Sequence, residues 1–146
     1  MAITQAICNS FKKQLLEGDA NFSNSSGDVF KIALYTSSAT LNSATTSFTT
    51  TNQVSNTGQY TSGGGKLVNL AVSNTAGVAR VDFSDRSFTG VTLTARGALI
   101  YNTSSAVTNA SVAVLDFGAD KTATSGVFTI QFPAQTSTAA ILRISG

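Results

Sequence analysis

Four aspartates are the side chains best able to do chemistry in this 146-residue chain. Asp82 and Asp85 follow one apolar segment, and Asp116 and Asp120 follow another. If these carboxylates converged in space, they could bind calcium or cleave a glycosidic bond. The chain lacks the dense alternation of Asp and Asn with a closing Glu that builds a dedicated calcium loop. We therefore expect the aspartates to accept backbone N–H bonds in turns, and we predict no metal and no cofactor.

Other catalytic residue types are scarce. The chain has no histidine, so a Ser or Thr nucleophile would have only Lys, Asp or Glu as its base. Asp116-Phe117-Gly118 matches the metal-binding triplet of protein kinases, but no kinase catalytic loop accompanies it. Gly63-Gly64-Gly65-Lys66 lacks both the first glycine of a phosphate-binding loop and the helix that should follow. The sequence predicts a protein that is not an enzyme.

Size and charge narrow the class of protein. A chain of 15.0 kDa fits a single domain over residues 1–146, and its one cysteine, Cys8, cannot form an internal disulfide. The net charge is only +2, and no basic cluster extends beyond Lys12-Lys13, which argues against nucleic-acid binding. No apolar run is long enough to cross a membrane, and no signal-peptide pattern opens the chain. We expect a soluble protein made in a cytoplasm.

One segment, residues 3–17, has helical spacing. Its apolar residues recur every fourth position and would form one face of a helix. That stripe consists of Ile3, Ile7, Phe11 and Leu15. Gly18 can adopt the left-handed conformation that ends a helix. The stripe would either close one end of a β core or dock onto a partner subunit, and the sequence leaves both open.

Strand-like runs separated by turn formers fill residues 29–146. The expected strands are Val29–Thr36, Lys66–Val72, Gly77–Phe83, Val91–Asn102, Ser111–Phe117, Val127–Phe132 and Ala139–Ile144. No helical segment intervenes to make the crossovers that parallel pairs need. The sequence therefore predicts a mainly β protein: an antiparallel β-sandwich or barrel with one N-terminal α-helix. Inside the longest run, Arg96-Gly97 predicts a bulge or a bend at a sheet corner.

A long polar stretch rich in Ser, Thr, Asn and Gly covers about residues 37–65. Such a segment is either an arm that contacts a partner or a solvated loop, here with a short strand near residues 48–51. Phe48 and Tyr60 are its large apolar side chains. Together with the helix stripe they give the candidate partner-contact residues: Ile3, Ile7, Phe11, Leu15, Phe48 and Tyr60.

Several segments resemble small structural proteins of tailed-bacteriophage virions. They are Ala2–Lys12, Phe30–Thr36, Ala95–Asn102, Val114–Gly118 and Phe128–Pro133, and they extend over nearly the whole chain. The resemblance implies a location in the virion after synthesis in the cytoplasm of a bacterial host. It implies contacts with the major coat protein and with copies of this chain, and it brings no catalytic motif. Our first expectation is a capsid decoration (cement) protein that bridges coat subunits, with a trimer favoured at a threefold position.

Three other functions stay open at this stage. The first is a tail or head–tail accessory subunit. The second is a carbohydrate- or host-surface-binding β-sandwich that presents Tyr60 and Tyr101 on loops, although the chain has no Trp to stack on sugars. The third is an enzyme acting through the four aspartates.

Overall fold

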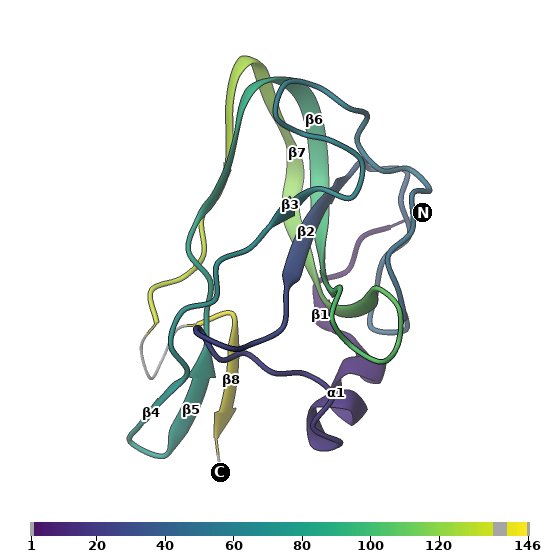
Figure 1. Ribbon diagram of the computed structural model, residues 1–146. Coiled ribbons are helices and arrows are strands. Elements are labelled where there is room, and N and C mark those ends of the chain that lie inside the picture. Colours follow the sequence, from purple (N-terminus) through teal and green to yellow (C-terminus); the bar gives the residue numbers. More distant parts are fainter. Residues whose placement is uncertain (1, 136–139, 146) are drawn as a thin grey trace.

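The computed structural model describes residues 2–135 and 140–145 (Figure 1). Within these ranges the strands are β1 (Ala6–Ile7), β2 (Phe30–Tyr35), β3 (Gly65–Lys66), β4 (Ser73–Thr75), β5 (Val78–Val81), β6 (Arg86–Asn102), β7 (Ala110–Ile130) and β8 (Leu142–Ser145), and the helix is α1 (Asn9–Leu16). The strands form a five-stranded sheet in the order β1-β7-β6-β2-β3 and a three-stranded sheet in the order β4-β5-β8. All pairs between these strands are antiparallel. The predicted fold class, mainly β with two sandwich-like antiparallel sheets and one helix near the N-terminus, is confirmed.

The β6–β7 hairpin organises the larger sheet. Its pairs run from Arg86↔Ile130 at one end to Asn102↔Ala110 at the other. Figure 1 shows the two strands side by side and folded over at the top of the view. One register shift falls between Ala95 and Gly97, where β7 advances from Asp116 to Lys121. Bulges of this kind bend and twist a strand pair, so the predicted bulge at Arg96-Gly97 is confirmed.

This bend also explains why two predicted strands are one. The runs Ser111–Phe117 and Val127–Phe132 were expected to be separated by a turn at Asp120, but β7 contains the first run and residues 127–130 of the second. Lys121 pairs with Ala95, and the Asp120 carboxylate lies 2.9 Å from Arg96 Nε. The residues around Asp120, whose sequence is typical of a turn, therefore form a bulge within a continuous strand.

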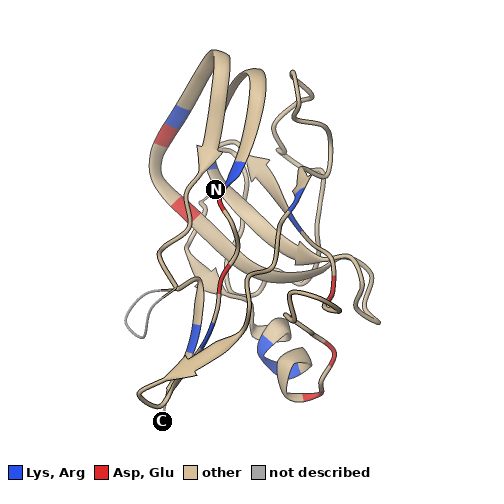
Figure 2. Cartoon of the chain, turned by 60° about the vertical axis from the view of Figure 1, so that its left-hand side comes forward, with Lys and Arg blue, Asp and Glu red and all other residues tan. Residues whose placement is uncertain are grey.

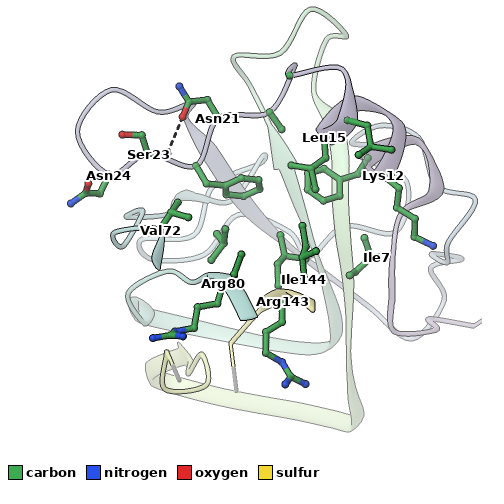
Figure 3. A pocket seen from close by; sticks show the side chains of 18 of the residues that line it. Ile7, Lys12, Leu15, Asn21, Ser23, Asn24, Val72, Arg80, Arg143 and Ile144 are labelled. Carbon is green, nitrogen blue, oxygen red and sulfur yellow. Dashed lines mark hydrogen bonds between the residues drawn. The ribbon is translucent and has the colours of Figure 1, made fainter. Parts of the chain in front are cut away.

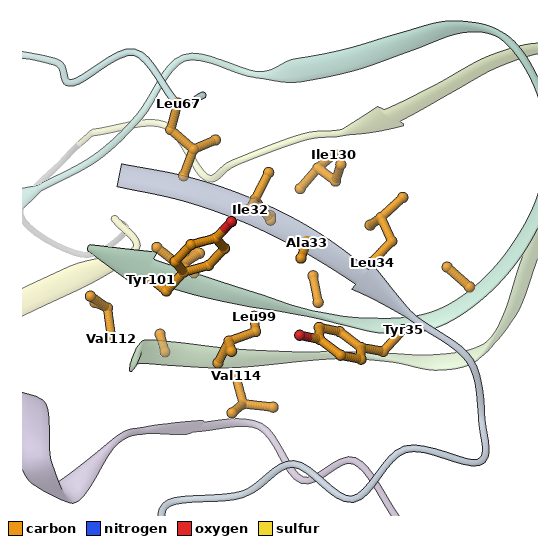
Figure 4. Packing of buried hydrophobic residues seen from close by; sticks show 14 of the residues in the cluster. Ile32, Ala33, Leu34, Tyr35, Leu67, Leu99, Tyr101, Val112, Val114 and Ile130 are labelled. Carbon is orange, nitrogen blue, oxygen red and sulfur yellow. The ribbon is translucent and has the colours of Figure 1, made fainter. Parts of the chain in front are cut away.

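The middle of the larger sheet is covered on both sides. In Figure 4, Leu67 and Ile130 lie on one side of β2, while Tyr35 and Val114 lie on the other. The second side is covered by the polar stretch after β2. There the Tyr35 hydroxyl donates to Thr49 O (2.6 Å). The expected alternation along β2 is present, but both of its faces are buried.

The polar stretch of residues 37–65 packs on its own sheet. Leu41, Val54 and Tyr60 are all buried. An isolated bridge between Ser47 and Ala110 stands where a short strand was expected near residues 48–51. The Ser111 hydroxyl also donates to Thr45 O (2.5 Å). Much of the segment is thus part of the folded body in the single chain.

The helix is shorter than the predicted 3–17. Ile3 forms a parallel bridge with Leu41, and Ala6–Ile7 pairs with β7 as β1. The backbone N–H of Cys8 then donates to Val112 O (2.9 Å). These bonds satisfy the backbone of residues 3–8 through the sheet, so helical bonding begins only at Asn9. With eight residues, α1 is not long and apolar enough to cross a membrane, and it is the one helix among the residues described.

Two of the remaining predicted strands are shorter in the structure than expected, and a third is a strand over its first residue only. Gly77–Phe83 contains β5, and Ala139–Ile144 overlaps β8, although its first residue lies outside the described residues. Lys66–Val72 is a strand only at its start, in β3, because the chain then leaves the edge of β2. The short strands limit the smaller sheet to three strands of three or four residues each.

The bend at Gly97 gives a test of the fold. A Cβ at this position would lie 2.5 Å from Leu115 O and 2.8 Å from Ile3 Cγ2, so Gly97→Ala should force backbone apart and lower the free energy of unfolding by about 1–3 kcal/mol. The matched control is Gly126→Ala in the same hairpin, where the nearest atom would be 3.4 Å away. Urea unfolding of both variants is the measurement. An equal effect of the two substitutions would contradict the close approach at Gly97.

Candidate interaction groove

An open groove lies between α1 and the three-stranded sheet (Figure 3). Its volume is about 820 Å³. The apolar residues that line it are Ile7, Phe11, Leu15, Leu16, Ala20, Phe22, Ala71, Val72, Ala79, Val81, Leu142 and Ile144. Four of its large side chains are open to solvent: Leu16 is 90 % exposed, Ile144 61 %, Val72 50 % and Ile7 37 %. Apolar side chains gathered around a hollow are typical of a surface that binds another molecule.

The two ends of α1 fix the helix wall of the groove. The helix begins after Cys8, whose backbone is extended and whose C=O accepts from Lys12 N (3.3 Å). It ends at Gly18, with φ +75°, where Gly18 N donates to Leu15 O and Asp19 N donates to Gln14 O. This pair of backbone hydrogen bonds is the Schellman motif, so Gly18 ends the helix as the sequence predicts. The ends of α1 place Phe11 toward the core and Leu16 at the open rim.

The loop after the helix is tied down by Asp28. Its carboxylate accepts from Asn21 N (3.0 Å) and from the side-chain amide of Asn102 (2.7 Å). Within the loop, the Asn21 side chain accepts from Ser23 N (3.0 Å), the bond drawn in Figure 3. These bonds hold the loop in one shape, with Phe22 directed into the core.

A row of five phenylalanine rings runs from the helix through β2 to the chain segments that follow β5 and β7. Phe22 stacks on Phe30 of β2, with ring centres 4.4 Å apart, and meets Phe11 of α1 edge-on at 5.8 Å. Phe30 then contacts Phe83, and Phe83 contacts Phe132, each at 5.7 Å. All five rings are buried. Aromatic pairs in these geometries contribute about 0.5–1.5 kcal/mol each beyond the area they bury.

The charged residues that line the groove are all cations. They are Lys12, Arg80 and Arg143, and the residues described at 2–135 and 140–145 bring no carboxylate into the lining. Arg80 and Arg143 stand directly opposite each other in the β5–β8 pair. Figure 2 shows basic segments on α1 and on adjacent strands of the small sheet. Side chains alternate along a strand, so Arg80 and Arg143 leave the small sheet on one face while the neighbouring Ile144 faces the groove. Figure 3 shows the Arg80 and Arg143 side chains directed away from the hollow, so the groove itself is mainly apolar.

The structure brings together three of the six residues proposed as partner contacts. Ile7, Phe11 and Leu15 line the groove, although Phe11 is only 2 % exposed. The other three lie elsewhere: Ile3 against Gly97, Phe48 stacked on Tyr101, and Tyr60 fully buried. The opposite wall, formed by Val72, Ala79 and Ile144, was not identified from the sequence. Each of these residues sits in or beside an expected strand, and no local pattern distinguishes an exposed valine or isoleucine there from a buried one.

The two tyrosines considered for sugar binding are not presented to solvent. Tyr101 lies in β6, not on a loop, and its hydroxyl donates to Gly63 O (2.5 Å). The Tyr60 hydroxyl accepts from Leu34 N (2.8 Å), and burial raises the pKa of Tyr60 to about 12. These side chains hold loops to the sheet, so they offer no stacking surface to a sugar.

The four aspartates act mainly on backbone N–H groups. Asp82 accepts from Phe83 N (2.9 Å), Asp85 from Phe132 N (2.8 Å) and Asp116 from Gly118 N (2.9 Å). The predicted acceptor role is thus confirmed for three of them, while Asp120 pairs with Arg96. Among residues 2–135 and 140–145, no three His, Cys, Asp or Glu side chains gather as a metal site would require.

Phe22 gives a test of the groove's floor. Phe22→Ala would remove the ring that touches Phe11, Phe30 and Phe83, and should lower the free energy of unfolding by about 3–5 kcal/mol. Urea unfolding followed by far-UV circular dichroism is the measurement. Phe48→Ala, which removes a half-buried ring stacked on Tyr101, is the matched control with an expected smaller loss. A larger loss in the control would contradict the central place of Phe22.

Asp82 gives a test by pH. Burial is the main cause that raises the pKa of Asp82; the backbone N–H of Phe83 opposes it, and the neighbouring charge of Asp85 adds to it. The folded protein therefore holds this proton more tightly than the unfolded chain does. Stability from this group is present in acid and is lost as pH rises from the unfolded-state pKa, near 4, through the raised folded-state pKa.

Asp82→Asn keeps an acceptor for Phe83 N but carries no charge. Relative to the parent chain, this variant should gain stability as the pH rises from acid to neutral, because the parent chain must ionise a buried carboxyl group and the variant need not. Urea unfolding at a series of pH values measures the difference, with the exposed Asp116→Asn as the control. A stability difference for Asp82→Asn that stays constant over this pH range would show that ionised Asp82 carries no burial penalty.

We compared the chain with protein-family models, with curated proteins and with solved structures, and none of them matches it.

Proposed function

We propose that the protein is a non-enzymatic structural subunit of a tailed-bacteriophage virion, and that it serves as a capsid decoration protein. In that role it would bind the assembled shell and bridge neighbouring coat subunits. The observation that carries the proposal is the open apolar groove with Leu16, Ile144 and Val72 exposed around it. Burial of such side chains against a neighbouring protein supplies binding free energy in proportion to the apolar area removed from water.

Bridging requires two contact faces, and the chain offers a second hollow. It follows β7, has a volume of about 540 Å³, and includes Leu115, Phe117 and Val127 in its lining. Val127 is 57 % exposed. Because none of these three residues lines the groove beside α1, one chain could contact two neighbours at once.

Both faces belong to a preformed body. The loop beside α1 is fixed by Asp28, and the long polar stretch is bonded to the larger sheet by Tyr35 and Ser111. A partner that binds such a surface does not have to order it first, so little binding free energy is spent on conformational entropy. This suits a protein that adds stability to a shell already in place.

Quantitative mass spectrometry of purified particles of the phage that encodes the chain tests the proposal. We expect copies in the hundreds per particle, in a simple ratio to the coat protein, because decoration follows the symmetry of the shell. A few copies per particle would indicate a tail or head–tail accessory subunit instead. Absence from purified particles would refute a virion role altogether.

Particles that lack the protein give the second measurement. They should release their DNA at a lower temperature than complete particles, and adding back the purified chain should restore the difference. Bovine serum albumin at the same concentration is the control for non-specific protection. Equal release temperatures with and without the chain would contradict a stabilising role.

A further inference from the structure

We infer that the open edge of β7, at residues 127–131, pairs with the same edge of a second copy of this chain about a twofold axis. The inference goes beyond the proposed function, because it describes a contact that the free chain makes in solution. Three observations lead to it: the direction of the backbone groups along this edge, the charges near it and the apolar residues that pairing brings together.

The other edges of the larger sheet are already covered where it matters. Beside β2, Val54 N donates to Leu34 O (2.9 Å), and β3 pairs with the start of the strand. The segment that leads into β1 is bridged to the chain after β2 by Ile3 and Leu41. In the part of the chain that the structure describes, no backbone group bonds to residues 127–131 on the side away from β6. This stretch of β7 is therefore an open edge.

Hydrogen bonds on β6 fix the direction in which the backbone of this edge points. Thr89 N donates to the Gln59 side chain (3.1 Å), and Thr89 O accepts from Gln59 N (3.0 Å), both on the side of β6 away from β7. Backbone groups alternate along a strand, so Ser87 also points away from β7. Its partner Thr129 then points away from β6, as do the residues two positions before and after it. The N–H and C=O groups of these residues are free to pair with another strand.

A twofold axis at Thr129 pairs this edge with itself. Thr129 faces Thr129 of the second copy and exchanges both backbone bonds with it, while Val127 faces Gln131 of the second copy. Phe132 N donates to the other side, beside β6. By the same alternation the nitrogen of Pro133, which carries no hydrogen, falls on the open side and ends the edge. Free donors thus meet free acceptors, and neither strand has to change its conformation.

The charges near this edge do not oppose self-pairing. Edge strands usually carry a charged side chain that prevents contact with another edge. Residues 122–142 contain no Lys, Arg, Asp or Glu, so this guard is missing. Beside the edge lies the second hollow, and among the described residues its charged lining is Asp116 and Lys121, which have opposite signs. A patch that carries both signs can meet a copy of itself without net repulsion.

Pairing also brings apolar residues together. Phe128 and Ile130 point to the inner side of this part of β7 and are only 8 % and 5 % exposed. With Thr129 on the axis, Phe128 faces Ile130 of the second copy, and an aromatic residue opposite a β-branched one stabilises a strand pair. Leu115 and Phe117, both half-buried, line the adjoining hollow of about 540 Å³, which an added strand would partly cover.

These conditions favour a second copy over a strand from another protein. The copy supplies free backbone groups, neutral facing side chains and apolar inner residues at once. Its strand is already extended and held by β6, so little conformational entropy is lost when the two edges meet.

Sedimentation equilibrium of the purified full chain tests the contact. We expect a mass near twice the 15.0 kDa of one chain, which falls toward that of one chain on dilution. A chain that stays monomeric up to about 1 mM, or one that forms a trimer, would overturn the inference. Because the measurement uses the free chain, either result would leave the proposed virion role intact.

A charge on the axis gives the second test. Thr129→Lys places two ammonium groups opposite each other and should raise the Kd of the dimer about tenfold or more. The matched control is Ser87→Lys: both residues are exposed and both substitutions remove the same hydroxyl contact (2.9 Å), but Ser87 lies on β6. Urea unfolding verifies that each variant is folded. A dimer that Thr129→Lys leaves as stable as that of the parent chain would show that the contact lies elsewhere.

Thr129→Cys tests the register and does not depend on the behaviour of the lysine variant. Facing residues that exchange backbone bonds have Cα atoms about 5.5 Å apart, which a disulfide can span. Oxidation with ferricyanide should therefore give a covalent dimer of Thr129→Cys and none of Ser87→Cys, since the natural Cys8 is buried. Failure to cross-link where the dimer predominates would refute an axis at Thr129. If the free chain is monomeric and Thr129→Lys weakens binding to particles, the edge takes a strand of another virion protein and the inference is wrong.

Discussion

The contact between Phe22 and its aromatic neighbours is the constraint on which the surface of this protein depends. The ring lies in a loop without regular structure, yet it touches rings from α1, from β2 and from the chain beside the small sheet. It keeps the helix and the small sheet on either side of one hollow, because it packs below them and does not fill the space between them. The hydrogen bonds that the Asp28 carboxylate accepts also stabilise this arrangement, since they fix the loop that carries Phe22.

Strand patterns predicted the β body well, and the helix less well, for a reason that lies in the spacing itself. Ile3 and Ile7 are four residues apart, an interval that places two side chains on one face of a helix and also on one face of an extended segment. Only pairing with Leu41 and with β7 decides between the two. Asp120 was misread for a related reason: its neighbours are turn formers, but a bulge in a long hairpin needs similar residues.

Only one of the two walls of the groove could be predicted from the sequence. Ile7 and Leu15 mark the helix wall, because an apolar stripe must face something. Val72 and Ile144 could not be assigned to the opposite wall, since their place beside the helix follows from tertiary packing and not from local pattern. Tyr60 is fully buried in the single chain, whereas Phe48 is half-buried and stays a candidate partner contact. Large aromatic residues in a polar stretch suggested contacts with a partner, but their own sheet lies nearer and they pack against it.

The strand order of the larger sheet has a consequence for how the chain is made. Of the strands in this sheet, β1 is synthesised first, yet it pairs with β7. Ala6 therefore cannot form its strand pair until Val114 has been synthesised. β2 likewise has no main partner until β6 emerges, at residues 97–102. The first third of the chain therefore stays unpaired during most of its synthesis, with apolar residues such as Phe30 and Ile32 exposed to other nascent chains. In this segment the apolar runs are separated by stretches rich in Ser, Thr and Asn, which limits the length of each apolar run exposed before the β6–β7 hairpin forms.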